Sequence, residues 1–229
     1  MKRTTKGGSD PREMPSYAIP EAAHYLGLPV ATMRAWALGQ KQGDKAPFKP
    51  IIVLPAAEPV LSFMNLVEAH VLAALRRQHR VALQKIRAGL VHLQRRFPSR
   101  HPLAEHAFAT DGVDLFVEKF GEIINLAEPD QLIMKKVLEA HLSRIERDAH
   151  GVPIKLFPFS RRGEVSDPKS IVIDPRVSFG RPVLAGTGIP TMIIAERYKA
   201  GESIAAIAED YHRQPSEIEE AVRCELAAA

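Results

Sequence analysis

Five side chains near the start of the sequence are of the types that contact DNA. They are Thr32, Arg34, Lys41, Lys45 and Lys49. An arginine can pair with a guanine edge through two hydrogen bonds, whereas threonine and lysine side chains reach phosphate oxygens. Phosphate contacts give affinity that does not depend on base sequence and that weakens as salt is added. We therefore expect these five residues to form a DNA-binding site.

The distribution of charge along the 229 residues favours the same location. Residues 1–100 carry 16 basic and 6 acidic side chains, residues 101–166 carry 8 and 11, and residues 167–229 carry 7 and 10. The formal net charge of +4 therefore conceals a basic first part and an acidic remainder. Long-range attraction to a polyanion favours the basic part as the binding surface. A solvated basic face without a partner is the alternative interpretation.

Residue patterns typical of enzymes are weak in this sequence. His101, Glu105 and His106 form the one close group among nine histidines, and no third histidine or cysteine accompanies them. The turn 185–190 contains Gly-Thr-Gly but lacks the third glycine and the lysine of phosphate-binding loops. No Ser-His-Asp or Cys-His arrangement can be argued from the spacing. We expect no enzymatic activity, no metal and no cofactor.

The cysteine count and the hydropathy indicate the compartment. Cys224 is the single cysteine, so an internal disulfide is excluded, which suits a reducing cytoplasm. We expect this thiol to be an ordinary helix residue without special reactivity. No stretch reaches the roughly 18 apolar residues of a membrane span, and the charged start lacks the apolar core of a signal peptide. The sequence predicts a cytoplasmic protein.

A helix-turn-helix is predicted to position the candidate DNA contacts. Pro20 suits the first turn of a helix, Gly27 can adopt the left-handed conformation that ends a helix, and Pro29 can start the next one. We expect Thr32 and Arg34 to project from this second helix, Thr32 toward phosphate and Arg34 toward phosphate or a guanine edge.

A hairpin is predicted to follow the two helices. The loop 39–50 is rich in glycine, proline and lysine, and the runs 51–54 and 60–63 favour strands. A hairpin directly after a helix-turn-helix is typical of a wing. We expect the lysines beside it to add salt-sensitive affinity for the DNA backbone.

Four elements are predicted in the middle of the chain: a helix from Asn65 to about Arg77, a helix over 83–97, two short strands over 114–127 that turn at Gly121, and a helix over 130–147. Asn65 and Glu68 have the spacing of a capping box. Apolar residues recur every three or four positions in the second helix. The strands are predicted because valine, isoleucine and phenylalanine favour extended chain.

The C-terminal residues predict a separate helical module. A strand over 170–174 precedes three helices that begin near Thr191, Ser203 and Pro215. The third helix is rich in glutamate, and carboxylates repel phosphates, so we expect this module to contact protein and not DNA. The sequence predicts a mainly α fold with small β-hairpins (α+β): a winged helix-turn-helix domain and a C-terminal module of three helices with helix-turn-helix proportions.

The predicted elements divide the chain into four parts. We expect a flexible arm at 1–15, a helix-turn-helix domain with a helical and β-hairpin extension at 16–150, a linker at 151–168 that begins with a strand, and a helical domain at 169–229. Proline and glycine cluster at these boundaries.

Both ends of the chain resemble known families. The segment Tyr17–Trp36, with Glu-Ala-Ala, Leu-Gly-Leu and Thr-Met-Arg-x-Trp at fixed positions and a hairpin after it, resembles the winged helix-turn-helix of MerR-type regulators. The segment Ile171–Pro190, followed by Gly201-Glu-Ser-Ile and Pro215-x-x-Ile, is similar to a small bacterial domain family of unknown function. Members of that family act as antitoxins beside PIN-like ribonuclease toxins in Vap-type modules. The long coiled-coil helix of MerR-type activators is not evident here.

The resemblance implies an antitoxin of a type II toxin-antitoxin system. Such a protein holds a PIN-like toxin inactive by direct binding and represses its own operon, commonly as a homodimer on two DNA half-sites. Arg161 and Arg162 are the candidate toxin contacts, because arginines can pair with the acidic pocket of such a toxin and exclude its metal. Two solvated linker arginines are the alternative. A MerR-like transcription regulator without a toxin partner, and a metal- or nucleotide-dependent enzyme, are the alternative functions.

Overall fold

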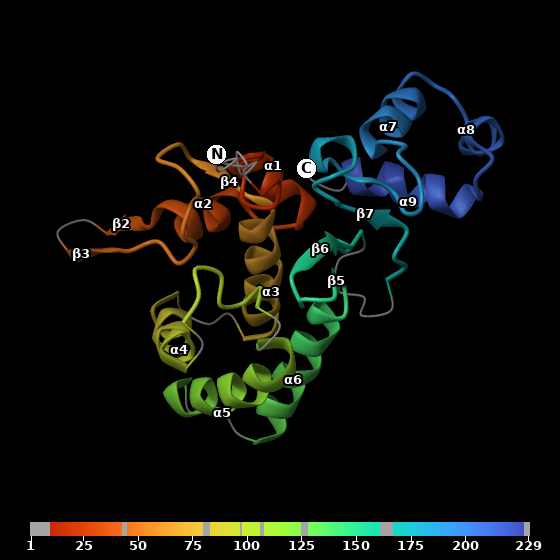
Figure 1. Cartoon of the computed structure of the whole chain (residues 1–229). Coiled ribbons are helices and arrows are strands. Elements are labelled where there is room, and N and C mark those ends of the chain that lie inside the picture. Colours follow the sequence, from red (N-terminus) through yellow and green to blue (C-terminus); the bar gives the residue numbers. More distant parts are fainter. Residues whose placement is uncertain are drawn as a thin grey trace, which may run out of the picture.

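The structure is a computed structural model of the whole chain (Figure 1). It describes residues 10–42, 45–79, 83–96, 98–105, 108–124, 128–160 and 167–226. The described residues form a mixed α+β fold in which helices dominate and the strands pair into two-stranded antiparallel sheets. A helix-turn-helix, a central group of helices and a C-terminal group of helices follow one another along the chain, and this confirms the predicted fold class.

The helix-turn-helix consists of α1 (Ile19–Tyr25) and α2 (Val30–Leu38). Gly27 lies between them with a φ of 59°, in the left-handed region that favours glycine. The Leu28 amide donates to the Ala23 carbonyl at 2.8 Å, which closes the turn. Met33 and Trp36 face inward and are fully buried. Local turn chemistry therefore gives the two helices the predicted arrangement.

The hairpin after α2 lies at a different place from the prediction. β2 (Gln40–Gln42) pairs with β3 (Lys45–Phe48), whereas 51–54 forms no strand. The amides of Ile51 and Ile52 donate to the Trp36 carbonyl at 2.8 and 3.0 Å, so this apolar run docks onto α2.

The second predicted strand of that hairpin has another partner. β4 (Val60–Leu61) pairs antiparallel with β1 (Tyr17–Ala18), which precedes α1. A small sheet therefore joins the residues just before α1 to those just before the helix that begins at Phe63. The apolar character that suggested one hairpin over 51–63 serves instead to bury Ile52 and Leu61 in the core.

The central helices are α3 (Phe63–His79), α4 (Leu83–Arg96), α5 (Val113–Ile124) and α6 (Glu128–Leu142). α3 begins before the predicted residue, because the capping box is formed by Ser62 and Asn65. The Ser62 amide donates to Asn65 Oδ1 at 3.1 Å, and the Asn65 amide donates to Ser62 Oγ at 3.2 Å. Asn65 is therefore N3, the third residue of the helix, and not its cap.

Two predictions for the central part of the chain are wrong. Strands were predicted over 114–127, but residues 114–124 lie in the helix α5, which packs between α4 and α6 and buries Phe116 and Val117, and residues 125–127 lie outside the described residues. The predicted helix 130–147 ends at Leu142, because the chain then enters β5 (Ile145–Arg147), which pairs with β6 (Pro153–Leu156). β6 lies where a strand was expected at the start of 151–168, and its Leu156 forms a bridge with Ile173.

The C-terminal module begins with the short strands β7 (Ile171–Val172) and β8 (Val183–Leu184), joined through the turn η2 (Ser178–Gly180). The predicted helices follow as α7 (Thr191–Lys199), α8 (Ile204–Tyr211) and α9 (Pro215–Leu226). Isoleucines from all three helices meet in a small core of their own, and Cys224 is buried in it.

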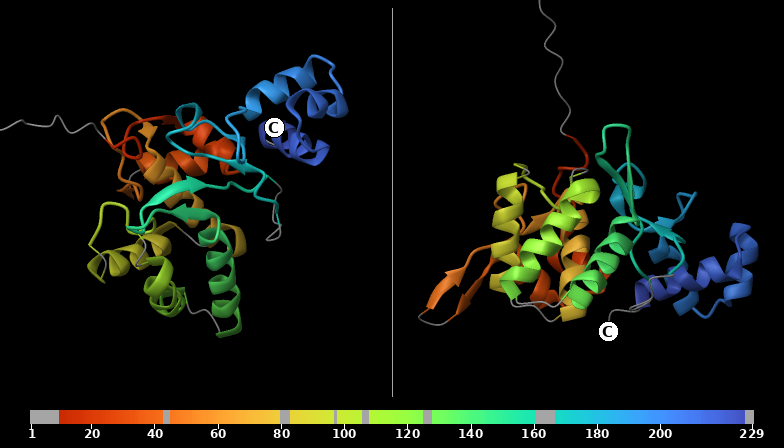
Figure 2. Two further views of the ribbon diagram at one scale, coloured as in Figure 1. Left: turned by 45° about the vertical axis from the view of Figure 1, so that its right-hand side comes forward. Right: turned by 90° about the horizontal axis from the view of Figure 1, so that it is seen from below.

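The N-terminal and central parts share one large hydrophobic core, and the C-terminal helices stand beside it (Figure 2). Polar contacts join the two parts. Tyr17 Oη donates to the Gly180 carbonyl at 3.0 Å, Arg181 pairs with Glu21, and His24 lies 3.7 Å from a Glu225 carboxylate oxygen. Within the described ranges, none of the helices has the length and apolar character to cross a bilayer.

Candidate nucleic-acid interface

The outward face of α2 carries one predicted DNA contact and lacks the other. Arg34 is exposed and lies between the exposed side chains of Val30 and Leu38. Thr32 is only 5% exposed, so the expectation that it projects from the helix is wrong. Positions 32, 33, 36 and 37 form the buried face of α2, and the helical repeat places Thr32 with the core residues.

The hairpin β2–β3 presents the predicted lysines next to α2. Lys41 lies in β2. Lys45 lies in β3 and pairs with Gln42 of β2, and Lys49 follows the hairpin with an exposed side chain. The hairpin extends away from the helices (Figure 1), so its backbone forms a projection beside the helix that carries Arg34. The helix that carries Arg34 is therefore followed directly by the hairpin that contains Lys41 and Lys45.

His101 and Glu105, two members of the close group around which no metal site was expected, contact other residues in the structure. His101 Nδ1 lies 2.8 Å from Glu68 Oε2, and His101 Nε2 lies 3.1 Å from Glu13 Oε2. Glu105 instead accepts a hydrogen bond from Ser99 Oγ at 2.6 Å, and His106 lies outside the described residues. No group of three metal-ligating side chains occurs among the residues that the structure describes.

Burial and charge shift both members of the inner pair. Burial raises the pKa of the Glu68 carboxyl, and the hydrogen bond from His101 opposes this. Burial lowers the pKa of His101, but the hydrogen bond and the charge of Glu68, with a contribution from Glu13, outweigh it and leave the pKa raised. Glu13 and Glu68 lie far apart in the sequence, so spacing gives no signal of this contact.

Glu13 belongs to the stretch that the sequence assigned to a flexible arm. Its neighbour Arg12 donates from Nη1 to Asp148 Oδ2 at 3.1 Å. The described residues 10–15 therefore contact the central part at two points: Arg12 contacts Asp148, and Glu13 contacts His101.

The candidate toxin contacts Arg161 and Arg162 lie outside the described residues. The residues that flank this segment are joined, because the Ser160 amide donates to Asp167 Oδ2 at 2.6 Å. Ser160 Oγ also bonds to the buried carboxylate of Glu220 on α9. Ser160 and Asp167, which flank the segment, therefore contact each other, and Ser160 also contacts α9 of the C-terminal module.

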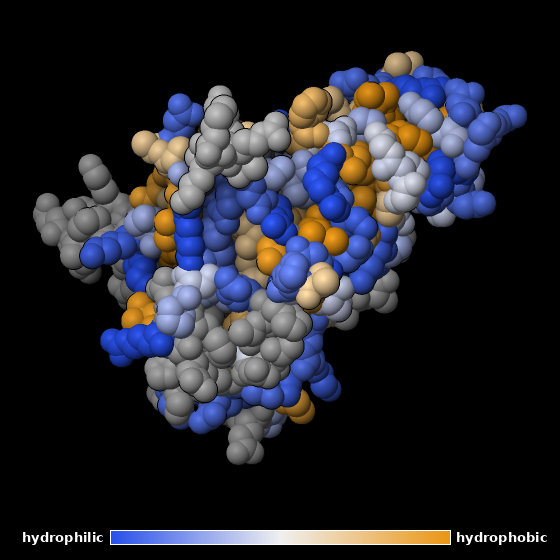
Figure 3. Space-filling model, viewed as in Figure 1, coloured by the Kyte–Doolittle hydropathy of each residue, from blue (hydrophilic) through white to orange (hydrophobic). Residues whose placement is uncertain are grey.

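The acidic third helix has mixed roles. Glu225 accepts a hydrogen bond from Thr191 Oγ1, Glu217 pairs with Arg213, and Glu220 is buried, while Glu219 is exposed. Apolar side chains are exposed on the neighbouring α7, where Met192 and Ile193 are 56% and 41% exposed. Figure 3 shows hydrophobic residues over this helix.

The side chain of Thr187 stabilises the turn 185–190. Thr187 Oγ1 donates to the Leu184 carbonyl at 2.8 Å and accepts from the Ile189 amide at 3.1 Å. This arrangement is that of a tight turn. It agrees with the interpretation of the Gly-Thr-Gly sequence as a structural turn.

Two families match the chain at its two ends. Residues 15–90 match the family described as "Putative DNA-binding HTH domain", and residues 171–223 match "Protein of unknown function (DUF433)". The fold and these matches define a helix-turn-helix protein with a second, C-terminal domain of the DUF433 type.

Full-length relatives share both parts. The chain is 31% identical to "Putative antitoxin VapB45" of Mycobacterium tuberculosis, with 92% of this chain and 93% of the relative covered. It is 28% identical to "Uncharacterized protein Rv2308" of the same organism, over 90% of this chain and 88% of the relative. A crystal structure of Rv2018 from M. tuberculosis superposes with a TM-score of 0.66 at 26% identity, covering 91% of this chain and 98% of that one. The chain belongs to the family of VapB45, the Vap-type antitoxins with an N-terminal helix-turn-helix.

Proposed function

We propose that this chain is the antitoxin of a type II toxin-antitoxin system. Its N-terminal module binds operator DNA and represses its own operon, and its remaining parts bind a PIN-like ribonuclease toxin and hold it inactive. It works as a cytoplasmic homodimer and as a regulator without enzymatic activity. The observation that carries the proposal is the exposed Arg34 on the second helix of a helix-turn-helix, in a chain that belongs to an antitoxin family.

The DNA contacts follow from the surface formed by α2 and β2–β3. Arg34 enters the major groove, where the exposed Val30 and Leu38 beside it suit contact with thymine methyl groups. The hairpin acts as a wing, and Lys41, Lys45 and Lys49 contact phosphates. Thr32 supports the helix from its buried side instead of reaching a phosphate.

A binding assay with the upstream duplex tests this surface. Replacing Arg34 by alanine is expected to weaken binding by about 1–3 kcal/mol and to relax base preference, because an arginine–guanine pair is lost. Replacing Lys49 by alanine is expected to weaken binding to all sequences and to reduce the salt slope by about 1. Fluorescence anisotropy across a salt series measures both effects.

Arg223→Ala is the matched control, because it removes one positive charge from a partly exposed arginine on α9. It is expected to leave the affinity unchanged. Equal losses for Arg34→Ala and Arg223→Ala would show that net charge, and not the α2 surface, governs binding.

Growth rescue tests the antitoxin role. Expression of the adjacent PIN-like frame alone is expected to arrest growth, and co-expression with this chain is expected to restore it. Alanine at both Arg161 and Arg162 is expected to abolish rescue while co-purification of the two proteins persists. Rescue by the double variant at the wild-type level would remove these arginines from the proposal.

A MerR-like transcription regulator without a toxin is the second candidate. The helix-turn-helix match supports it as much as it supports the antitoxin, since both roles need DNA binding. The genomic neighbour separates them: an adjacent PIN-like frame whose product this chain neutralises supports the antitoxin, and a neighbour without toxicity supports the regulator.

A further inference from the structure

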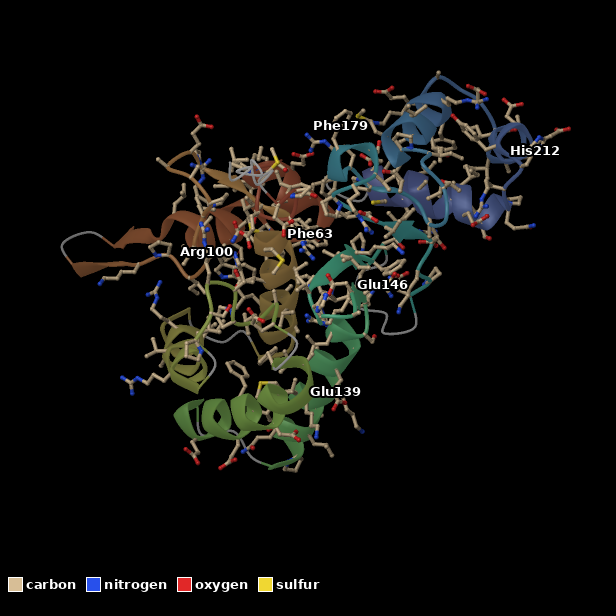
Figure 4. All side chains as sticks on the ribbon, in the orientation of Figure 1. Phe63, Arg100, Glu139, Glu146, Phe179 and His212 are labelled. Atoms are coloured by element: carbon tan, nitrogen blue, oxygen red, sulfur yellow. The ribbon has the colours of Figure 1, made fainter. Side chains whose placement is uncertain are left out.

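Arg144 is a buried arginine in the turn between α6 and β5. Figure 4 labels Glu139 on α6 and Glu146 on β5, the two elements that this turn joins. Arg144 is only 3% exposed. Burial of a guanidinium costs free energy unless its N–H groups are hydrogen-bonded, so a buried arginine needs partners that fit its fixed geometry. The partners of Arg144 therefore show which parts of the chain this residue holds.

The Arg144 side chain donates to backbone carbonyls on both sides of the segment 161–166, which lies outside the described residues. Four carbonyls accept these hydrogen bonds, two before the segment and two after it: Phe157 at 2.6 Å, Pro158 at 3.1 Å, Asp167 at 2.8 Å and Pro168 at 3.1 Å. The Nη2 atom alone donates to one carbonyl of each pair. One planar group therefore joins the chain before the segment to the chain after it.

The ring of Phe159 adds a further contact on the side before the segment. The guanidinium carbon of Arg144 lies 4.3 Å from the centre of this ring, which suits a cation–π interaction. The ring centres of His70 on α3 and His141 on α6 lie 5.6 and 4.8 Å from the centre of the Phe159 ring, and both histidines are buried. Two central helices therefore hold Phe159 in place together with Arg144.

The two sides of the segment also contact each other. The Ser160 amide donates to Asp167 Oδ2 at 2.6 Å, and Ser160 Oγ bonds to Glu220 on α9. Asp167 and Glu220 are both buried. The residues on either side of the segment are therefore held by contacts in which the segment itself takes no part.

We propose that Arg144 is a positioning residue for toxin binding, because it holds the chain on both sides of Arg161 and Arg162. These two arginines are the toxin contacts of the proposed function, and the inference rests on that function for their role. Ordering a long side chain on association costs free energy, and the cost is lower where the backbone beside it is already held. Loss of the Arg144 contacts is therefore expected to weaken the complex through Arg161 and Arg162.

The shape of the guanidinium carries this role, and its charge does not suffice. A lysine at position 144 keeps the positive charge but ends in a compact ammonium group, which cannot replace a planar fork that reaches four carbonyls. Arg144→Lys therefore tests geometry at constant net charge. Arg147→Lys is the matched control, because Arg147 on β5 also donates to backbone carbonyls, those of Ala104 and Gly151.

Calorimetric titration of the full chain with the product of the adjacent PIN-like frame tests the proposal. Arg144→Lys is expected to weaken the complex at least about tenfold, whereas Arg147→Lys is expected to leave its affinity unchanged. Absence of toxin binding by the unaltered chain would contradict the proposed function. Toxin binding by the unaltered chain that Arg144→Lys leaves unchanged, or that Arg147→Lys weakens as much, would overturn only the role of Arg144.

A double-mutant cycle separates positioning from a general loss of structure. In a chain with alanine at both Arg161 and Arg162, Arg144→Lys is expected to have no further effect on toxin affinity, because the side chains that it positions are absent. An equal loss in both backgrounds would overturn the proposal. The comparison with Arg147→Lys decides alone where the doubly altered chain binds too weakly for the cycle.

Operator affinity is the internal control for folding, and Arg144→Lys is expected to leave it unchanged. Arg144→Met is the second variant, because it removes the donors without placing an unpaired charge in the core. It is expected to weaken toxin binding as much as Arg144→Lys does, again with operator affinity unchanged. Loss of operator affinity by both variants would make the role of Arg144 purely structural and would overturn the proposal.

Discussion

His101 lies between two carboxylates that come from distant parts of the chain. Glu68 on α3 approaches Nδ1 and Glu13 approaches Nε2, and both His101 and Glu68 are buried. An imidazolium ion is stabilised by this arrangement, whereas burial alone would favour the neutral ring. The group is therefore a structural contact whose strength depends on protonation.

The stability of the protein is expected to depend on pH through His101. Its pKa is raised in the folded state, so its contribution is fully present below the ordinary histidine pKa of about 6.5 and is lost as pH rises through the raised value. His101→Gln is expected to lower the free energy of unfolding by about 1–3 kcal/mol at pH 6, because Glu68 loses a charged partner. Urea denaturation at a series of pH values measures this dependence.

The exposed His150 provides the control. His150→Gln is expected to leave both the stability and its pH dependence as they are. A His101→Gln variant that keeps the full decline in stability above pH 6.5 would contradict the assigned role.

Cys224 is expected to be unreactive in the native protein. Burial raises the pKa of its thiol to about 12, so the thiolate is scarce at neutral pH. A colorimetric thiol reagent is expected to modify Cys224 only after denaturant is added. Rapid labelling without denaturant would mean that α9 opens readily.

At the scale of elements, short polar contacts set where the helices begin. Ser203 Oγ accepts from the Ala206 amide at 3.1 Å and so caps α8. α8 has only eight residues, so its stability depends on this cap and on the burial of Ile207.

Ser203→Ala is expected to lower the free energy of unfolding by about 1 kcal/mol, because one amide at the start of α8 loses its acceptor. Chemical denaturation followed by far-UV circular dichroism measures the change. Ser216→Ala, at an exposed position in α9, is the control and is expected to be nearly neutral. Equal effects of the two variants would argue against the cap.

The helices with local start and stop signals were predictable from the sequence. Gly27 and Pro29 separate α1 from α2, and Ser203 and Pro215 mark α8 and α9. α5 was missed because its valine, isoleucine and phenylalanine content was taken to favour strands, although its apolar residues 113, 116, 117, 120 and 124 recur at the three- and four-residue steps of a helix. The strands β2 and β3 lack an alternating apolar pattern, so the hairpin was assigned to the more apolar run after it.

The candidate site was predictable in part. The sequence places Arg34 on the second helix, as the structure does, but it places Lys41 and Lys45 in a loop before the hairpin, whereas they lie in the strands β2 and β3. It does not reveal that Thr32 is buried, because Thr32 lies next to Met33 at the edge of the apolar stripe of α2. The contact between Glu13, Glu68 and His101 depends on tertiary structure alone.

At the scale of the whole molecule, the two cores are linked by contacts at the surface between them. Tyr17 reaches Gly180, His24 approaches Glu225, and Leu156 bridges to Ile173. These contacts couple the helix-turn-helix and the central part to the C-terminal module.

The two parts are expected to unfold in one transition. Trp36, the single tryptophan, reports on the helix-turn-helix through its fluorescence, while far-UV circular dichroism reports on all the helices. Coincident urea transitions by the two probes are expected. Tyr17→Phe is expected to lower the midpoint of both together by removing a buried hydrogen bond worth about 1 kcal/mol. Two separate transitions in the unaltered chain would contradict the coupling.

The carbonyl of Trp36 receives the amides of both Ile51 and Ile52. The chain therefore leaves α2 at its end and returns to the same helix at Ile51 and Ile52. The hairpin residues between these two points begin and end at α2. A segment whose two ends meet the same helix can be replaced without a change to the rest of the fold. Because the proposed base contact, Arg34, lies outside this segment, replacing the segment with the equivalent stretch of a relative is expected to change the salt dependence of DNA binding and to leave the base preference as it is.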